Sequence, residues 1–126
     1  MSDDDAFGSV RYIVHDVQAA IDFYTTHLGF RLRSHPAPPF ADVTRGSLRV
    51  LLSGPGSSGA RATPAAADGP GRNRIHLLVD DLALEVERLQ AAGVAMHGDV
   101  VSGPGGQQVL VADPDGNLVE LFEPAG

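Results

Sequence analysis

The chain has 126 residues, 43% of them hydrophobic, which is enough for one ordinary domain with its own core. Cysteine is absent, so disulfides, thiolate metal ligands and cysteine nucleophiles are excluded. The net charge is −7 at pH 7 and the arginines form no basic stripe, so we expect no nucleic-acid partner. No apolar run approaches the roughly 20 residues of a membrane span, and the N-terminus lacks the basic and apolar regions of a signal peptide. We therefore expect a cytoplasmic protein with no membrane partner.

The first strand and helix follow in order. Residues 10–14 are mostly β-branched or aromatic and predict a strand. Asp16 then stands where a helix N-cap is expected, and Gly29 stands where the helix should end in a left-handed residue. Between them, apolar side chains recur at helical spacing and predict one buried stripe: Val17, Ile21, Tyr24 and Leu28. A second strand is expected from residue 30.

The same pattern occurs again in the second half of the chain. Residues 75–79 predict a strand, Asp81 an N-cap and Gly93 the end of a helix. The apolar stripe of this helix is predicted to consist of Leu82, Val86 and Leu89. The sequence therefore contains an internal repeat.

Each helix is followed by a predicted hairpin. Residues 40–54 and residues 108–122 both indicate strand, turn and strand, with Gly46 and Gly116 in the turns. Pro114 fixes the backbone of the second turn, and Gly116 permits a positive φ there. Each half is thus predicted to be a β-α-β-β-β module, which makes the chain an α+β protein.

Residues 53–73 lie between the halves and are rich in Gly, Pro, Ser and Ala, which disfavours a packed element. We expect one domain over residues 1–126, with a first module at about 8–54, a connection at 55–73 and a second module at about 74–124. The connection is interpreted either as a flexible linker or as a mobile lid over a pocket.

Three stretches carry a resemblance to a known family. In chain order they are "VRYIVHDVQAAIDFYTTHLGF", "RIHLLVDDLALEVERLQAAGV" and "DPDGNLVELFEP". Together they resemble the vicinal oxygen chelate superfamily, which includes glyoxalase I, extradiol dioxygenases, fosfomycin-resistance enzymes and bleomycin-binding proteins. The resemblance covers about residues 8–124. It implies tandem βαβββ modules that form an open, U-shaped mixed β-sheet trough, with the helices outside and a ligand inside.

Strand alternation assigns the side chains to the two faces of each sheet. The helix-facing set is predicted to contain Val10, Tyr12, Val14, Ile75, Leu77 and Val79. Leu118, Glu120 and Phe122 are expected to face the trough, with Leu48, Val50 and Leu52 opposite. The predicted ligand-binding set comprises Ser9, Arg11, Ile13, Phe40, Val50, Arg74, His76, Leu78, Glu120 and Phe122.

The resemblance also implies four metal-ligand positions in the trough. Here they carry Ser9, Val50, Arg74 and Glu120, of which only Glu120 is a usual ligand. His76 is two strand residues from Arg74, about 6.6 Å, and this distance prevents it from replacing a ligand there. We therefore expect no cofactor and no tightly bound metal, with a divalent metal as the alternative.

The lone carboxylate of Glu120 needs a counter-charge, for which Arg74 and Arg11 are the candidates. One interpretation is an ion pair that only fills the former metal site. The other is that the pair, together with His76, orients a polar ligand. His76 and Glu120 are also the candidate general bases. His15, His27, His35 and His97 are interpreted as ordinary surface or strand-end residues.

Three functions remain open. The first is capture of an amphipathic or aromatic small molecule, as in the antibiotic-sequestering, bleomycin resistance-like branch. The second is an enzyme, either a metal-dependent lyase, isomerase or dioxygenase, or a metal-independent enzyme that uses His76 or Glu120 as base. The third is an interaction protein with a vestigial pocket. The resemblance implies a homodimer, with the trough built within one chain or across a swapped pair.

Overall fold

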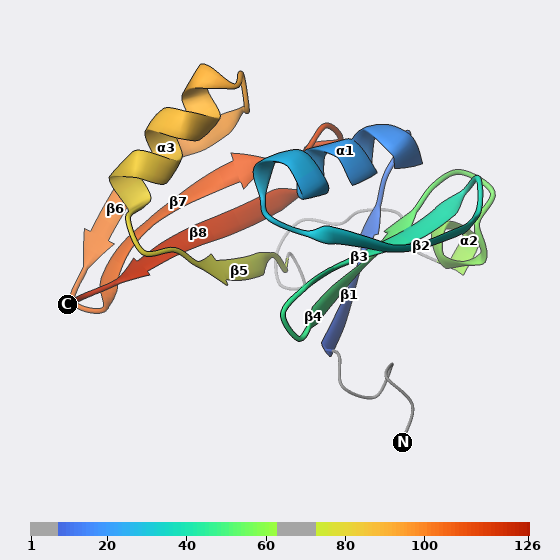
Figure 1. Cartoon of the computed structure of the whole chain (residues 1–126), viewed down its shortest axis with the longest axis horizontal. Helices are drawn as coiled ribbons and strands as arrows, with labels where there is room; N and C mark the ends of the chain where they lie inside the picture. The colour runs from blue at the N-terminus through green and yellow to red at the C-terminus, as the bar shows by residue number, and fades with distance from the viewer. Residues whose placement is uncertain (1–7, 63–72) are drawn as a thin grey trace. The chain divides into compact units, whose positions relative to one another are not determined.

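The computed structural model describes residues 8–62 and 73–126 (Figure 1). The chain forms two compact units, Met1–Asp68 and Gly69–Gly126. Each unit contains one of the two repeats, with a four-stranded sheet and one longer helix. Within the described residues, no helix is both long and apolar enough to cross a membrane.

Unit 1 is a β-α-β-β-β module followed by a short helix. Its elements are β1 (Gly8–Ile13), α1 (Val17–His27), β2 (Arg31–Ala37), β3 (Phe40–Arg45), β4 (Leu48–Ser53) and α2 (Ser58–Ala62). The strand order in the sheet is β1-β4-β3-β2, with β1 parallel to β4 and the other neighbours antiparallel.

Unit 2 repeats this arrangement. Its elements are β5 (Ile75–Leu78), α3 (Leu82–Ala91), β6 (Met96–Gly103), β7 (Gly106–Ala112) and β8 (Leu118–Pro124). The order β5-β8-β7-β6 corresponds strand by strand to that of unit 1, and again only the first pair is parallel. The predicted α+β fold with tandem βαβββ modules is confirmed, whereas the U-shaped trough between the modules stays a prediction.

The helix ends follow the predicted capping residues. The side chain of Asp16 accepts a hydrogen bond from the backbone N–H of Ala19 at 3.0 Å. Gly29, just after α1, has a φ of 73°, a left-handed conformation that strains residues with a Cβ. In α3, Asp81 caps the N-terminus, and Gly93 has a φ of 79° beyond the C-terminus. Local sequence therefore sets where both long helices begin and end.

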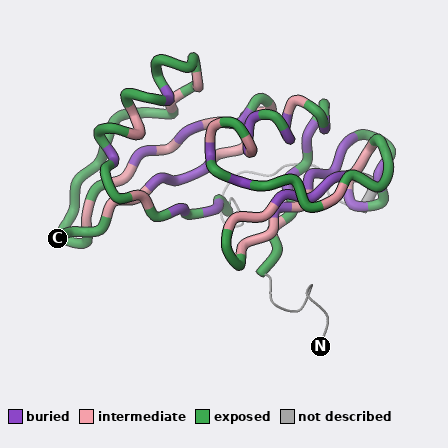
Figure 2. The backbone as a smooth tube through the Cα atoms, in the orientation of Figure 1, coloured by how far each residue is buried: buried purple, intermediate pink, exposed green. Residues whose placement is uncertain are grey.

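α1 covers one face of the sheet of unit 1 and forms the core there (Figure 2). Tyr24 is fully buried, with its ring centroid 6.4 Å from that of Tyr12 on β1 and 5.5 Å from that of Phe30. The predicted apolar stripe is buried throughout: Val17, Ile21, Tyr24 and Leu28. We call this side of the sheet the α1 face and the other side the open face of unit 1.

The core of unit 2 follows the same alternation. α3 contacts β8 and buries Leu82 and Leu89, while Val86, the third predicted stripe residue, is half-buried. One face of the sheet carries the buried strand residues Ile75, Leu77, Val109, Val111, Val119 and Leu121. We call the opposite side the open face of unit 2.

Part of the predicted linker is a packed element. Residues Ser58–Ala62 form α2, which contacts β1 and β4. The hydroxyl of Ser57 accepts a hydrogen bond from the backbone N–H of Ala60 at 3.2 Å and so caps the first turn. The prediction that no packed element occurs in this stretch is therefore wrong for α2. The choice between linker and lid concerns residues 63–72, which lie outside the described residues.

Candidate functional site: the open faces of the two sheets

The strand register shows which side chains share a face in unit 1. Directly paired residues on neighbouring strands point to the same side of a sheet. Tyr12 packs against α1 and pairs with Leu52, and Val10 pairs with Val50. Val50 is fully buried on the α1 face, so the predicted placement of Leu48, Val50 and Leu52 in the trough is wrong.

The error comes from the hairpin turns. The sequence comparison aligned the two hairpins at Gly46 and Gly116. In unit 1 the strands are joined through residues 46–47, but in unit 2 through the longer turn 113–117. Matching the hairpins at these glycines puts Val50 at the position of Glu120, whereas the strand pairs Arg11–Leu51 and His76–Glu120 put Leu51 there. Since side chains alternate along a strand, this offset of one residue exchanges the faces. Leu51, rather than Val50, is the residue of β4 that corresponds to Glu120.

The open face of unit 1 consists of three rows of side chains across the strands β1, β4, β3 and β2. The rows are Ser9, Arg49, Thr44 and Arg31; then Arg11, Leu51, Asp42 and Ser34; then Ile13, Ser53, Phe40 and Ala37. The face thus contains Ser9, Arg11, Ile13 and Phe40, as predicted, although their role in binding stays a prediction.

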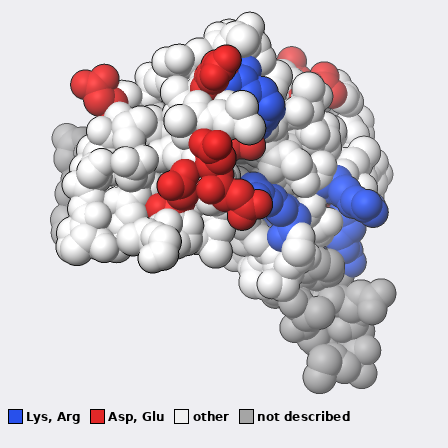
Figure 3. Space-filling model, turned by 60° about the vertical axis from the view of Figure 1, so that its left-hand side comes forward, with Lys and Arg blue, Asp and Glu red and all other residues white. Residues whose placement is uncertain are grey.

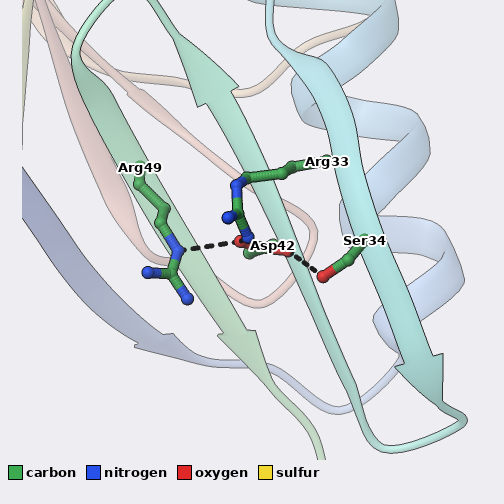
Figure 4. A network of polar contacts seen from close by, with 4 residues as sticks. All are labelled: Arg33, Ser34, Asp42 and Arg49. Atoms are coloured by element: carbon green, nitrogen blue, oxygen red, sulfur yellow. Dashed lines mark hydrogen bonds and ion pairs between the residues drawn. The ribbon is translucent and has the colours of Figure 1, made fainter. Parts of the chain in front are cut away.

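Asp42 lies at the centre of a polar network that the sequence analysis missed (Figure 4). Its side chain has no exposed surface. Oδ2 accepts from Arg33 Nη1 at 3.0 Å and from Arg49 Nε at 2.8 Å, and Oδ1 accepts from the hydroxyl of Ser34. The sequence contains one signal of this network. Asp42 is a single acid within the apolar stretch "FADV", as Glu120 is within its strand, and such an acid needs a counter-charge.

The charge state of Asp42 follows from these contacts. Burial raises the pKa of its carboxyl group, but the hydrogen bonds from Ser34, Arg33 and Arg49 outweigh burial. The net result is a pKa below the ordinary value for an aspartate. Asp42 is therefore ionised at neutral pH and holds both guanidinium groups on the open face.

Arg11 and Ser53 lie on the same face near α2. A Cβ atom added at Gly59 would stand 1.6 Å from Arg11 Nη1 and 2.9 Å from Ser53 Oγ, so the glycine makes room for both side chains. Ser53 Oγ is buried and has no hydrogen-bond partner among the residues that the structure describes. The β1 end of this face is thus partly closed by α2.

On the open face of unit 2, two rows of paired residues hold the predicted site. They are His76, Glu120, Leu110 and His97, and next to them Leu78, Phe122, Gln108 and Val101. The predicted placement of His76, Leu78, Glu120 and Phe122 on one face is confirmed.

Glu120 is paired on both carboxylate oxygens. Arg74 contacts Oε1 from Nη2 at 2.9 Å and from Nε at 3.0 Å, which confirms the predicted ion pair. His76 Nε2 lies 3.5 Å from Oε2, and its ring centroid is 5.1 Å from that of Phe122. Arg11, the alternative counter-charge, lies in unit 1. A carboxylate, two cationic or titratable groups and an aromatic ring thus meet at one place on the sheet.

A separate cavity of about 580 Å³ lies in unit 1 around the start of α1. It is lined by His15, Asp16, Val17, Gln18, His35, Pro38, Pro39 and Pro55. The sequence predicts ordinary roles for His15 and His35 and contains no signal that their segments meet. None of these lining residues belongs to the three rows of the open face of unit 1.

Comparison with known proteins agrees with this fold. The model of the Glyoxalase/Bleomycin resistance protein/Dioxygenase superfamily matches residues 6–121. The chain belongs to this superfamily. Among curated proteins, none matches the chain.

Several solved structures of similar size share the superfamily fold. TnmS3, an antibiotic binding protein from Streptomyces sp. CB03234, is 28% identical with a TM-score of 0.71, over 94% of this chain and 95% of its own. TioX from Micromonospora sp. ML1 is 25% identical with a TM-score of 0.73, over 94% and 98%. Lactoylglutathione lyase from Agrobacterium tumefaciens is 25% identical with a TM-score of 0.69, over 91% and 90%.

The strand register changes one of the four metal-ligand positions that the superfamily resemblance implies. With the register of β4 in place, they carry Ser9, Leu51, Arg74 and Glu120. Of these four residues, only Glu120 is a usual metal ligand. Its carboxylate already forms an ion pair with Arg74, whose Nη2 lies 2.9 Å from Oε1.

Proposed function

We propose that this member of the superfamily captures an amphipathic or aromatic small molecule on the open face of unit 2, without a tightly bound catalytic metal. The observation that carries the proposal is Glu120, paired with Arg74 and His76 beside the ring of Phe122. A bound molecule would meet polar groups and an apolar surface at the same place, as in most small-molecule sites.

The ion pair supports a metal-free site. A catalytic zinc or non-haem iron usually needs three protein ligands. Here the guanidinium of Arg74 stands beside the one suitable carboxylate and would repel a cation. Its charge instead favours a polar or anionic group on the ligand.

The apolar side of the same face supports an aromatic ligand. Leu78 is 59% exposed and pairs with Phe122, whose ring lies against His76. Covering such surface with a ligand ring stabilises the complex by roughly 25 cal/mol per Å² of apolar area. Offset or edge contacts with Phe122 and His76 would add to this gain.

The similarity to TnmS3 supports the antibiotic-sequestering branch, because that structure is described as an antibiotic binding protein. Lactoylglutathione lyase is similar to nearly the same extent, so the comparison alone favours neither binding nor catalysis. The donor set is what favours binding here.

The proposal is tested by titrating the purified protein with bleomycin and a panel of aromatic antibiotics, measured by thermal shift and calorimetry. We expect at least one compound to raise the melting temperature saturably. Phe122→Ala and His76→Ala should weaken that binding about tenfold or more. Glu87→Gln, which alters an exposed carboxylate on α3, is the control and should bind normally. If no compound shifts the melting temperature, an interaction protein with a vestigial pocket becomes the better interpretation.

Metal content is tested separately. The protein is exposed to Fe(II), Mn(II), Zn(II), Ni(II) and Co(II), desalted and analysed for elements. We expect far less than one ion per chain. About one ion per chain, lost in Glu120→Gln, would contradict the proposal and direct work to glyoxalase and dioxygenase assays.

One observation favours a second candidate, a metal-independent enzyme. His76 Nε2 faces Glu120 Oε2 at 3.5 Å, and a carboxylate beside an imidazole can orient it as a general base. Arg74 could then stabilise a developing oxyanion. Turnover of any compound that binds, with a pH–rate profile that disappears in His76→Ala, would establish this alternative.

A further inference from the structure

We propose that the open face of unit 1 contains an oxyanion-binding site, in which Arg49 and Arg31 bind a carboxylate, phosphate or sulfate group while the carboxylate of Asp42 holds Arg49 in place from the sheet. The site lies within unit 1 and does not depend on the ligand proposed for unit 2.

The first argument is the charge of this sheet. The strands β1–β4 contain five arginines and a single acid, Asp42, although the whole chain has a net charge of −7. Figure 3 shows one face of the molecule, on which some of the blue arginine groups lie directly against red acidic groups. The strands of this sheet therefore carry a net positive charge, although the whole chain is negatively charged.

The second argument is the surplus of positive charge around Asp42. Arg31, Arg33 and Arg49 carry three positive charges against the one negative charge of Asp42, which leaves two. One guanidinium group would be enough to neutralise the carboxylate. Arg31 takes no part in the described contacts of Asp42, and a bound anion would balance its positive charge.

The third argument is the geometry of Arg49. Only its Nε donates to Asp42, at 2.8 Å, and in Figure 4 its two terminal nitrogens point away from the carboxylate. Among the described residues, Nη1 and Nη2 of Arg49 have no hydrogen-bond partner. These two nitrogens form the planar fork that matches two oxygens of a carboxylate or phosphate.

Access and neighbours complete the site. The side chain of Arg49 is 21% exposed, so it is held in place yet can be reached from solvent. Arg49 pairs with Thr44, and Thr44 pairs with Arg31 on the next strand. One row of the open face thus presents a guanidinium, a hydroxyl and a second guanidinium, all donors to an anion.

Arg45 shows that not every arginine of this sheet belongs to the site. Its Nη1 donates to the carbonyl oxygen of Leu28 at 3.2 Å, next to the end of α1. This contact gives it a structural role at the helix C-terminus. The argument therefore concerns Arg31 and Arg49 and not the basic composition of the strands in general.

The test measures binding of sodium sulfate, sodium phosphate and sodium benzoate by the full chain, by NMR chemical shifts and calorimetry at constant ionic strength, with chloride as reference. We expect saturable binding of at least one oxyanion. Arg49→Gln should weaken it tenfold or more and Arg31→Gln severalfold. Arg88→Gln removes one positive charge from α3 and should leave the affinity unchanged. Tighter binding of benzoate than of sulfate would identify an aromatic carboxylate, and the reverse a phosphate-like or sulfate-like group.

Arg49→Gln removes a partner of Asp42 and could disturb folding, so Arg31→Gln is the decisive variant, because Arg31 pairs with no acid within the described residues. Arg49→Lys keeps the charge but lacks the fork, and should bind more weakly than the wild type and more tightly than Arg49→Gln. The proposal is overturned if no oxyanion binds better than chloride, or if Arg88→Gln weakens binding as much as Arg31→Gln. His76→Ala should leave sulfate binding intact, which separates this site from the one on unit 2.

Discussion

At the scale of single residues, each of the two sheets contains a carboxylate paired with arginine, but the two carboxylates differ in their surroundings. Asp42 and Glu120 are carboxylates within apolar strands, and each is held by arginine. Asp42 is completely buried under two arginines, whereas Glu120 retains an exposed neighbour in Arg74. Asp42 therefore contributes mainly to stability and to the position of the arginines, while the ion pair of Glu120 can be reached from solvent through the side chains of Arg74 and His76.

Asp42→Asn should lower the free energy of unfolding by about 1–3 kcal/mol, because Arg33 and Arg49 lose a charged acceptor in a buried place. Urea denaturation at pH 7 measures the change. Asp22→Asn, an exposed carboxylate on α1, is the control and should have little effect. Equal stability of Asp42→Asn and the wild type would show that the network is energetically neutral.

The lowered pKa of Asp42 predicts a specific loss of stability in acid. A carboxyl group with a lower pKa in the folded state stabilises the protein above its unfolded pKa, and that stabilisation disappears as the pH falls through the folded pKa. The wild type should thus lose stability below about pH 4, where unfolded aspartates begin to take up protons. Asp42→Asn should have a shallower pH dependence there, and parallel curves for the two proteins would contradict this assignment.

Ser53 and Ser57 form a matched pair of buried hydroxyl groups. Ser53 Oγ has no partner within the described chain, so Ser53→Ala should leave stability unchanged or raise it by up to about 1 kcal/mol. The Ser57 hydroxyl donates to Gly54 O at 2.7 Å and caps α2, so Ser57→Ala should cost about 1 kcal/mol. Thermal unfolding of both variants gives the comparison, and a clear loss in Ser53→Ala would indicate a contact outside the described residues.

At the scale of elements, the repeats show how local signals set strands and helices. Asp16 and Asp81 cap equivalent helices, and the turn 113–117 is held by the carboxylate of Asp113, which accepts from the backbone N–H groups of Asp115 and Asn117. These interactions lie within a few residues of one another in the chain. For that reason, they were predictable from the sequence.

The hairpin of β6 and β7 offers an element-scale test at its turn. Gly106 has a φ of 147°, and a Cβ atom there would lie 2.1 Å from the backbone oxygen of Glu123 on β8. Gly106→Ala should therefore push β7 and β8 apart and cost about 2 kcal/mol or more. Gly103→Ala, on the other side of the turn, meets no atom within 4 Å and should be nearly neutral. Similar melting temperatures of the two variants would mean that β8 does not pair here as described.

At the scale of the whole molecule, the open faces leave apolar side chains uncovered. Leu78 and Val101 are each 59% exposed and Ile13 is 38% exposed. Covering such side chains with a ligand or a partner removes apolar surface from water and is favourable. Covering by a second copy is consistent with the homodimer that the superfamily resemblance implies.

We accordingly expect the protein, whose chain mass is 13.1 kDa, to have twice that mass in solution. Light scattering after size-exclusion chromatography at micromolar concentration measures it. Leu78→Gln should reduce the dimer fraction if this face lies in the interface, whereas Leu84→Gln, an equally exposed position on α3, is the control. A protein that is monomeric at all concentrations would contradict the expected dimer. A bound ligand would then be the better explanation for the exposed apolar side chains.

The sequence by itself determined the repeat, the helix caps, the places of the two hairpin turns and the faces of the alternating side chains in β1, β5 and β8. It also predicted the pair of Arg74 and Glu120, because a lone carboxylate in an apolar strand requires a counter-charge. All of these depend on spacing along the chain or on the chemistry of single residues, which a sequence contains directly.

Only the tertiary structure decided which face of β4 is buried and where Asp42 finds its partners. The side-chain period of a strand is two, so the length of one turn was enough to move Val50 from the predicted trough to the α1 face. Arg33 and Arg49 meet Asp42 from the two strands that flank β3, and this contact exists only after both hairpins have paired. Register and cross-strand contact are properties of the assembled sheet, and periodicity within one strand does not contain them.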